Sequence, residues 1–258
     1  MLIALTRELS PRIAECELTH RRRQPIDLAR ARAQHRAYED ALSALGCAVL
    51  RLPASADLAD SVFVEDAAVV LDEVAVLARP GAASRRPELE EVAAALAPYR
   101  RLVRIEAPGT LDGGDVLRIG RRLFVGLSSR TDEAGCGQLR AALAPFGYGV
   151  QPVPVEGCLH LKSAATAVGE DSLLLNPRWV DGAAFSRLRL VEVDPEEPDG
   201  ANALLVGSTV LYPIAFPRTL ARLQARGLAV VPVDASELAK AEGGLTCCSL
   251  LFEAGPPP

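Results

Sequence analysis

The sequence has 258 residues, more than one average domain and fewer than two, so one large α/β or repeat-built domain fits as well as a pair. With 49% hydrophobic and 24% charged residues, the composition excludes a disordered or collagen-like chain. The formal net charge is only −5, which gives no sign of a surface for nucleic acid or for an anionic membrane.

The N-terminal segment gives no targeting signal. Its apolar run, Leu2 to Leu5, is too short for the core of a secretory signal and has no basic segment before it. No stretch approaches the roughly 18 apolar residues of a membrane-spanning helix. Cysteines in such a chain are expected to stay reduced, so we predict a cytoplasmic protein. The chain has no CxxC pair and its three histidines lie far apart, so we expect no metal site.

The predicted elements begin with a strand at 2–6, a helix at 26–45 and a strand at 47–52. After these, one order of elements repeats: two short strands, a helix and a further strand. The first unit is predicted as strands at 62–64 with 67–71 and at 74–78, a helix at 87–96 and a strand at 102–105. The second has strands at 116–119 and 123–125, a helix at 131–143 and a strand at 150–155. The third (164–168, 173–175, weak helix 182–188, 190–193) and the fourth (204–206, 210–212, helix 217–226, 229–233) follow the same order.

A last strand is predicted at 247–252, and together with the N-terminal elements it makes a fifth unit. Pairing the strands at the two ends would close the units into a ring and remove exposed sheet edges. We therefore predict a five-bladed α/β propeller, with residues 1–258 as a single domain of five ββαβ-like units. The alternative, a doubly wound sheet, would show single strands between helices and a glycine-rich phosphate loop, and neither is evident.

Two adjacent cysteines follow a Gly-Gly turn in the segment Gly243-Gly244-Leu245-Thr246-Cys247-Cys248. A single cysteine is most often an apolar core residue, but the turn leaves room for a ligand. Adjacent strand residues point to opposite faces, so only one cysteine of the pair can line a given site. Its position directly after the turn favours Cys247 as the reactive one.

His160 lies between two leucines, a setting typical of a buried core histidine. A cysteine and a histidine far apart in sequence can nevertheless form a nucleophile and proton-transfer pair once folded. At a usual pKa of about 8.5, only ~3% of a cysteine is thiolate at pH 7. A positive neighbour, either an imidazolium or a cationic substrate, would have to raise that fraction.

Acidic residues cluster in two segments, Asp60 to Asp66 and Asp112 to Asp115. Alone they would be ordinary turn residues, but Glu65 and Asp66 are flanked by apolar residues. Buried carboxylates there require a cation. Arg85 and Arg130 each precede a predicted helix, where an arginine can hold a carboxylate in bidentate fashion.

The segments DSVFVEDAAVV, RPGAASRRPE, LDGGDVL, FVGLSSRTDE, LHLKS and LTCCSLL resemble, in this order and spacing, the dimethylarginine dimethylaminohydrolase family. That family comprises guanidine-modifying enzymes with the five-bladed pentein fold. The resemblance extends from Leu18 to Leu251 and implies a catalytic triad of Cys247 as nucleophile, His160 as general acid and base, and Asp112 as the third member. Some members carry glutamate at the Asp112 position, so this chain resembles the aspartate-bearing subset.

The resemblance also implies a substrate site. Asp66 and Glu65 would hold the guanidinium group. The residues implied at the amino-acid end are Leu18, Asp60, Arg85 and Arg130, with backbone carbonyls from Leu18 and Ala241. Phe63 could add an apolar wall, because it lies between Asp60 and Asp66.

The implied reaction is hydrolysis of N-omega-methylated arginine, asymmetric dimethylarginine or monomethylarginine, to citrulline and dimethylamine or methylamine. It would pass through a covalent S-alkylthiouronium on the cysteine and need neither metal nor organic cofactor. Two alternatives stay open, a deiminase that releases ammonia from arginine or agmatine, and an arginine-binding module without turnover. The complete Cys247, His160 and Asp112 set argues against a mere binding module, and the short chain with its LTCCSLL ending is unlike the longer deiminases. The expected partner is a small-molecule substrate.

Overall fold

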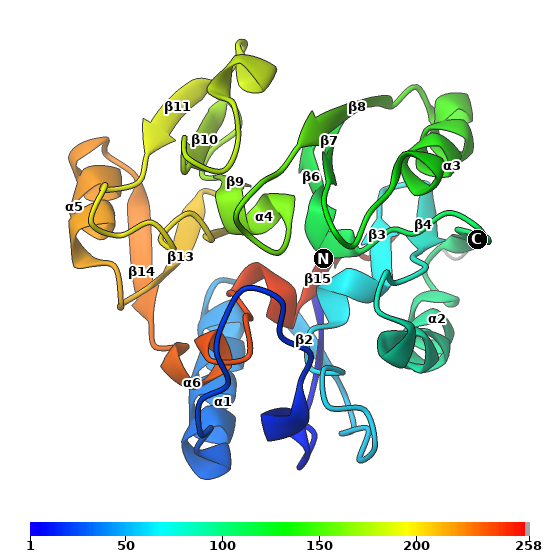
Figure 1. The fold of residues 1–258 in the computed structure, drawn as a ribbon, viewed down its shortest axis with the longest axis horizontal. Coiled ribbons are helices and arrows are strands. Elements are labelled where there is room, and N and C mark those ends of the chain that lie inside the picture. The colour runs from blue at the N-terminus through cyan, green and yellow to red at the C-terminus, as the bar shows by residue number, and fades with distance from the viewer. Residues whose placement is uncertain (256–258) are drawn as a thin grey trace.

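The computed structural model describes residues 1–255, in which fifteen strands form five three-stranded sheets arranged as a ring (Figure 1). In every sheet, the middle strand pairs antiparallel with one neighbour and parallel with the other. The predicted five-bladed α/β propeller is therefore confirmed. We number the blades one to five around the ring, following the chain.

Blade one contains β15 (Leu250–Glu253), β1 (Leu2–Arg7) and β2 (Ala48–Leu52), with helix α1 (Leu28–Ala44). Blade two contains β3 (Ala68–Val70), β4 (Val74–Leu77) and β5 (Arg101–Arg104), with α2 (Leu89–Leu96). Blade three contains β6 (Val116–Ile119), β7 (Arg122–Leu127) and β8 (Gly149–Pro154), with α3 (Glu133–Leu143). Blade four contains β9 (Ala165–Ala167), β10 (Ser172–Leu175) and β11 (Arg189–Glu192), with a 3-10 turn, η6 (Gly182–Phe185). Blade five contains β12 (Leu204–Val206), β13 (Thr209–Pro213) and β14 (Ala229–Val233), with α5 (Pro217–Ala225).

Short helical segments lie between these elements. They are η1 (Ile13–Glu15), η2 (Val64–Ala67), η3 (Ala83–Glu88), η4 (Gly113–Asp115), η5 (Ala144–Phe146), α4 (Leu161–Ala164), α6 (Ser236–Ala239) and η7 (Thr246–Cys248). Five of them, η2, η4, α4, α6 and η7, connect one blade to the next, whereas η1, η3 and η5 lie within blades. None of the helices within residues 1–255 is both long and apolar enough to cross a membrane.

The ring closes within blade one, where β15 pairs antiparallel with β1. Close to this pair, the Ala254 N–H donates to the Met1 carbonyl at 2.8 Å. β1 is thus paired on both sides, by β15 and by β2, although β1 and β15 come from opposite ends of the described chain.

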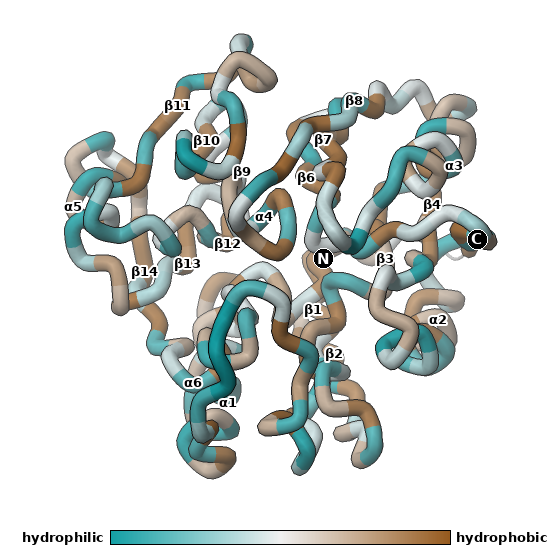
Figure 2. Tube along the Cα trace, viewed as in Figure 1, coloured by the Kyte–Doolittle hydropathy of each residue, from teal (hydrophilic) through white to brown (hydrophobic). Residues whose placement is uncertain are grey.

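Apolar side chains fill the spaces between neighbouring blades. Leu5 of blade one packs in the same cluster as Leu77 of blade two, and Leu117 of blade three in the same cluster as Leu173 of blade four. In Figure 2 the strands are largely brown, whereas the outer helices carry both brown and teal residues. In α2 and α3 the buried residues recur at helical spacing, for example Val92 with Leu96 and Leu139 with Leu143, so each helix packs one apolar face against the protein.

Several predicted boundaries are wrong, and three of them have a clear physical reason. Residues 62–64 do not form a strand, because the Phe63 N–H bonds locally to the Asp60 carbonyl at 2.9 Å and η2 begins at the next residue. The last strand begins at Leu250 rather than at residue 247, since Thr246–Cys248 winds into η7. The first helix begins at Leu28, where the Asp27 side chain caps it by accepting from the Arg30 N–H.

Candidate active site

A small polar pocket lies where the connecting segments of the blades converge. Its free volume is only about 20 Å³, whereas two neighbouring cavities of about 360 and 320 Å³ lack its concentration of titratable groups. The residues that line it are Glu17, Asp60, Phe63, Asp66, Arg85, Arg130, Leu159, His160, Ala241, Glu242, Gly243 and Cys247. Most of the predicted site residues therefore meet here, although they come from segments far apart in the chain.

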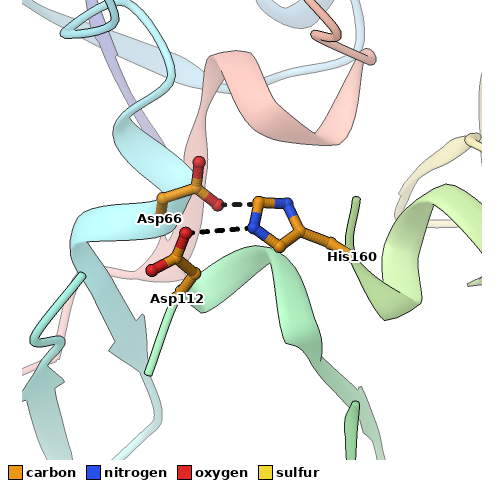
Figure 3. A group of neighbouring side chains, drawn as sticks. All are labelled: Asp66, Asp112 and His160. Atoms are coloured by element: carbon orange, nitrogen blue, oxygen red, sulfur yellow. Dashed lines mark hydrogen bonds and ion pairs between the residues drawn. The ribbon is translucent and has the colours of Figure 1, made fainter. Parts of the chain in front are cut away.

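His160, at the start of α4, is the centre of a buried group of three side chains (Figure 3). Its Nε2 lies 3.0 Å from Oδ2 of Asp112, and its Nδ1 lies 3.8 Å from Oδ1 of Asp66. Asp112 directly precedes η4, and Asp66 lies in η2. The imidazole ring is thus held between two carboxylates from two different blade connections.

Burial by itself lowers the pKa of His160, but the carboxylates of Asp66, Asp115 and Asp112 outweigh it and raise the pKa to about 9. Burial would conversely raise the pKa of Asp66, yet the charges of His160 and Arg85 lower it to about 2. At neutral pH the group therefore consists of an imidazolium and ionised Asp66. A protonated histidine is the state needed to donate a proton to a leaving group.

Asp112 is fully buried and held on both oxygens, because its Oδ1 accepts from the Gly81 N–H at 3.0 Å. The second glycine of the Gly-Gly bend, Gly114, makes the group possible. A Cβ atom there would lie 2.5 Å from Nδ1 of His160 and 2.6 Å from Oδ1 of Asp66. Only a residue without a side chain can pass so close to both.

Among residues 1–255, Asp66, Asp112 and His160 form a group whose potential metal-binding atoms all lie within 4.8 Å of one another. Both histidine nitrogens already face a carboxylate. With its pKa raised to about 9, the imidazolium itself supplies the positive charge between the two acids.

Cys247 lies in η7 and is partly exposed to the pocket, and the Gly244 N–H points at its sulfur at 3.3 Å. Cys248 is 1% exposed, packs in an apolar cluster and faces the Gly244 carbonyl. The two thiols diverge because of the turn, not because of the strand alternation we expected. Burial and the carboxylates of Glu65 and Asp66 raise the pKa of Cys247 to about 12, so a nearby cation is needed to form the thiolate.

Arg85, predicted to bind the substrate carboxylate, lines the pocket and makes several contacts with protein groups. It forms ion pairs with Asp66 and, at 2.8 Å, with Glu88, and it donates to the carbonyls of Asp60 and Phe63. A buried guanidinium requires such partners, and here they come from the protein. The structure thus places Arg85 at the wall of the pocket, paired with Asp66.

Arg130 is the other arginine of the pocket. Its Nη2 donates to the Thr19 hydroxyl at 3.1 Å, and no carboxylate within residues 1–255 forms an ion pair with it. Asp60 also lines the pocket, and its Oδ2 accepts from the Glu17 N–H at 3.0 Å. Ala241 lines the pocket too, whereas Leu18 is only partly buried, beside the lining residue Glu17.

Glu65 was predicted to hold the guanidinium together with Asp66, but its carboxylate points elsewhere. It accepts from Nζ of Lys162 at 2.5 Å and from the Thr246 hydroxyl at 2.8 Å, and it lines the separate cavity of about 320 Å³. The two adjacent acids diverge because η2 turns their side chains in different directions. The structure therefore pairs the Glu65 carboxylate with a protein cation, outside the lining of the pocket.

Sequence reasoning missed Glu88 and Glu242. Glu88 follows Arg85 by three residues and could have been read as its partner on one helical face. The Glu242 carboxylate accepts from the backbone N–H groups of Thr19, at 2.9 Å, and His20, at 2.6 Å, and so fastens that segment over the pocket. The free volume of about 20 Å³ holds no more than one or two water molecules, so a larger ligand requires the lining residues to move apart.

No protein-family model matches the sequence. The chain is 44% identical to the N(G),N(G)-dimethylarginine dimethylaminohydrolase of Streptomyces coelicolor, over 96% of this chain and 95% of that protein. Its structure is similar, with a TM-score of 0.93 and 33% identity, to a cysteine-to-serine mutant of the Pseudomonas aeruginosa dimethylarginine dimethylaminohydrolase complexed with citrulline. That match covers 96% of this chain and 98% of the other. A dimethylarginine dimethylaminohydrolase adduct with S-methyl-L-thiocitrulline, a histidine-to-glycine variant, matches with the same TM-score and identity over 98% and 100%.

Proposed function

The chain belongs to the dimethylarginine dimethylaminohydrolase family, and we propose that it hydrolyses N-omega-methylated arginine to citrulline and a methylated amine. The observation that carries the proposal is the buried pair of His160 and Asp112, at 3.0 Å, in one pocket with Cys247. A nucleophile, a proton-transfer group and a residue that orients it are the parts that acyl-type substitution requires.

Binding of the guanidinium group comes first. Asp66 is ionised and lines the pocket, so it supplies the negative charge that a guanidinium cation requires. Arg85 and the Gly114 N–H fix the Asp66 carboxylate, and this fixes the plane of the bound guanidinium. The entering cation also offsets the carboxylates that hold Cys247 in its thiol form. The thiol can then release its proton to solvent water, because His160 already carries a proton at neutral pH.

Attack and departure of the amine follow. The Cys247 thiolate forms a bond to the central guanidinium carbon, and the electron pair of one C–N bond moves to the substituted nitrogen. His160, positively charged at neutral pH, gives that nitrogen a proton. Dimethylamine or methylamine leaves, and a cationic S-alkylthiouronium stays on the cysteine.

Hydrolysis completes the cycle. His160, now neutral, takes a proton from a water molecule whose oxygen attacks the same carbon. The C–S bond then breaks, the second water proton returns to the sulfur, and citrulline is released. Asp112 holds the imidazole in one orientation through both proton transfers.

The amino-acid end of the substrate would lie under the segment that covers the pocket. We assign the substrate carboxylate to Arg130, because this guanidinium has no carboxylate partner within residues 1–255. The α-amino group would meet the Asp60 carboxylate and the backbone carbonyls of Leu18 and Ala241. We give Glu65 no direct contact with the substrate, since Lys162 occupies it.

Preference for methylated arginine would follow from an apolar contact at the leaving nitrogen. Phe63 is 4% exposed, lines the pocket and packs against Gly243, where a Cβ atom would lie 2.2 Å from the ring. A site that hydrogen-bonds every N–H of arginine would lose about 1–3 kcal/mol for each buried acceptor deprived of its donor by methylation. An aromatic wall carries no such penalty.

We also propose that residues 1–258 act as one catalytic domain, because residues lining or supporting the pocket come from several blade connections. A cytoplasmic location fits the six cysteines, all of which are free. The partner would be the small-molecule substrate alone.

The test is incubation of the purified protein with asymmetric dimethylarginine, monomethylarginine and arginine, with citrulline and the released amine both quantified. We expect kcat/KM for the two methylated substrates to be well above that for arginine. Comparable or higher kcat/KM on arginine, with ammonia released, would instead make the protein a deiminase. No citrulline from any substrate, with binding retained, would make it a binding module.

A further inference from the structure

The side chain of Asn202, in the connection from β11 to β12, joins three parts of the ring. It is 8% exposed, and its Nδ2 donates to the Lys162 carbonyl at 2.9 Å and to the Thr246 hydroxyl at 3.0 Å. Its Oδ1 accepts from the Thr246 N–H at 3.2 Å. Both ends of this buried amide are thus used, and both bind Thr246, the residue directly before Cys247.

Thr246 is held from the other side as well. Its hydroxyl donates to Oε2 of Glu65 at 2.8 Å, and Oε1 of Glu65 accepts from Nζ of Lys162 at 2.5 Å. Asn202 also binds the Lys162 carbonyl. Asn202, Thr246, Glu65 and Lys162 are therefore joined in a closed ring of hydrogen bonds. Both oxygens of the Glu65 carboxylate accept hydrogen bonds within this ring.

The turn that carries Cys247 is weakly held by its own backbone. The Cys248 N–H reaches the Leu245 carbonyl, and the Ser249 N–H the Thr246 carbonyl, only at 3.4 Å. Both distances are longer than a well-formed N–H to O bond. The turn therefore depends on outside contacts for its position, and the amide of Asn202 provides several of them.

Asn202 also contacts the other end of the turn. A Cβ atom on Gly244 would lie 2.4 Å from Cγ and Oδ1 of Asn202, so the asparagine packs directly against the glycine backbone. The Gly244 N–H in turn points at the Cys247 sulfur at 3.3 Å. Moving Asn202 would thus shift both the backbone that carries the sulfur and the N–H that faces it.

We propose that Asn202 is a positioning residue that holds the Thr246 and Gly244 ends of the turn and so aims the Cys247 sulfur into the pocket. The proposal rests on Cys247 being the nucleophile, as in the proposed function. Asn202 leads into blade five, and no residue of β12, β13, α5 or β14 lines the pocket. Since Asn202 does not line the pocket, its loss should affect the reaction step more than substrate binding.

The test compares Asn202→Ala with Asn176→Ala as a matched control. Asn176 is also a buried asparagine with both amide ends bonded, to the Pro198 carbonyl at 2.8 Å and the Arg178 N–H at 2.9 Å. We expect Asn202→Ala to lower kcat by about 100-fold, as small displacements of reacting groups do, with KM within about threefold. Asn176→Ala should lower Tm without this loss of kcat.

Two variants of Thr246 distinguish the effect of its hydroxyl hydrogen bonds from the effect of its packing. Thr246→Ser keeps the hydroxyl that Glu65 and Asn202 bind, so it should lose much less kcat than Thr246→Val. Equal losses in the two Thr246 variants, or equal losses of kcat in the two asparagine variants, would overturn the proposal.

A second readout needs no turnover. Iodoacetamide alkylation of Cys247 in the free enzyme, followed by peptide mass spectrometry across pH, reports the state of its sulfur. Asn202→Ala changes none of the charged groups that face Cys247, which are Glu65, Asp66, Lys162 and His160. Losing the aimed Gly244 N–H should slow alkylation about tenfold at a given pH, as for a thiol whose pKa is one unit higher.

The control Asn176→Ala should keep the wild-type alkylation profile. An unchanged profile in folded Asn202→Ala would refute the positioning role whatever the activity. If the wild-type protein makes no citrulline from any substrate, the proposed function fails, and the alkylation contrast still decides the role of Asn202.

Discussion

His160 and Asp112 meet at 3.0 Å across a blade junction, since Asp112 leads into blade three and His160 into blade four. Both side chains are buried, at 3% and 0% exposure. The proton-transfer group and the carboxylate that orients it are therefore brought together by neighbouring blades, so their distance depends on how those blades pack.

The raised pKa of His160 predicts a pH-dependent stability. A folded-state pKa of about 9, above the usual 6.5, means that the protonated ring stabilises the fold. This contribution is complete below about pH 6.5 and is lost as pH rises through 9. We expect Tm to fall by roughly 5 °C or more over this range, measured by differential scanning calorimetry.

His160→Gln is the control, and its Tm should change much less between pH 6.5 and 9. Other buried acids change the stability mainly outside that window. The contribution of Asp115, whose pKa is raised to about 6, is lost below that window, and that of the Cys247 and Cys158 thiols, whose pKa values are raised to about 12, is lost chiefly above pH 9. A wild-type Tm that stays level from pH 6.5 to 9 would contradict the assignment of the imidazolium.

The two adjacent cysteines should differ in function. Cys247→Ser should abolish citrulline formation, because a hydroxyl is a far weaker nucleophile than a thiolate at this pH. Cys248→Ser should keep most of it, since this thiol is buried and faces the Gly244 carbonyl. Citrulline assays of both proteins, each checked for folding by circular dichroism, make the comparison, and equal loss in both would remove Cys247 from its role.

A trapping experiment tests the covalent intermediate. In His160→Gly, attack should survive better than hydrolysis, so acid quenching with substrate present should leave an adduct on the peptide that contains Cys247. Peptide mass spectrometry locates the adduct. Modification of Cys16, Cys47, Cys136 or Cys158 instead would rule out the mechanism.

The two arginines of the pocket should fail in different ways. Arg130→Ala should raise KM by about 10- to 100-fold, the value of a lost hydrogen bond to a charged group, and leave kcat within a few-fold. Arg85→Ala should lower kcat and also Tm, because it leaves Asp66 and Glu88 buried without their cation. Steady-state kinetics and thermal melts separate the two, and a kcat loss in Arg130→Ala at constant KM would move that arginine to the reacting centre.

Two glycine-to-alanine substitutions should differ in their effect, because one added methyl group meets the active site and the other meets open space. Gly114→Ala should abolish activity, because its Cβ would lie 2.5 Å from Nδ1 of His160. Gly137→Ala, inside α3 and with nothing within 4 Å of the added Cβ, should raise the free energy of unfolding by about 1 kcal/mol and leave activity intact. Melting curves and citrulline assays check both, and an active Gly114→Ala enzyme would show that His160 and Asp66 need not be so close.

The repeat of short strands and helices predicted the ring because apolar periodicity is local and repeats at each blade. The same local pattern was misleading at Val62 to Val64, where three apolar residues lie in a turn and the start of η2. Those side chains are buried by contacts with other segments, not by a strand ladder. Three residues are too few for alternation to distinguish the two cases.

The site was predicted residue by residue, but the partners of those residues were not. Glu65 and Asp66 are adjacent in sequence, and only the structure shows that one meets Lys162 and the other Arg85. Asn202 gave no signal, because an asparagine after Asp-Gly-Ala is typical of an ordinary turn. The partners in such contacts lie far apart in the chain, so the contacts produce no repeating pattern in the sequence.

The pairing of β1 with β15 has a consequence for when, during synthesis, the proposed active site can be completed. Cys247 lies three residues before β15, so a ribosome-bound chain can stack four blades while its proposed nucleophile is still unmade or undocked. His160, Asp112 and Asp66 could by then be in position, while the Cys247 sulfur is still absent from the pocket. The reactive thiol arrives with the strand that completes blade one, so an unfinished molecule has no means to start the reaction.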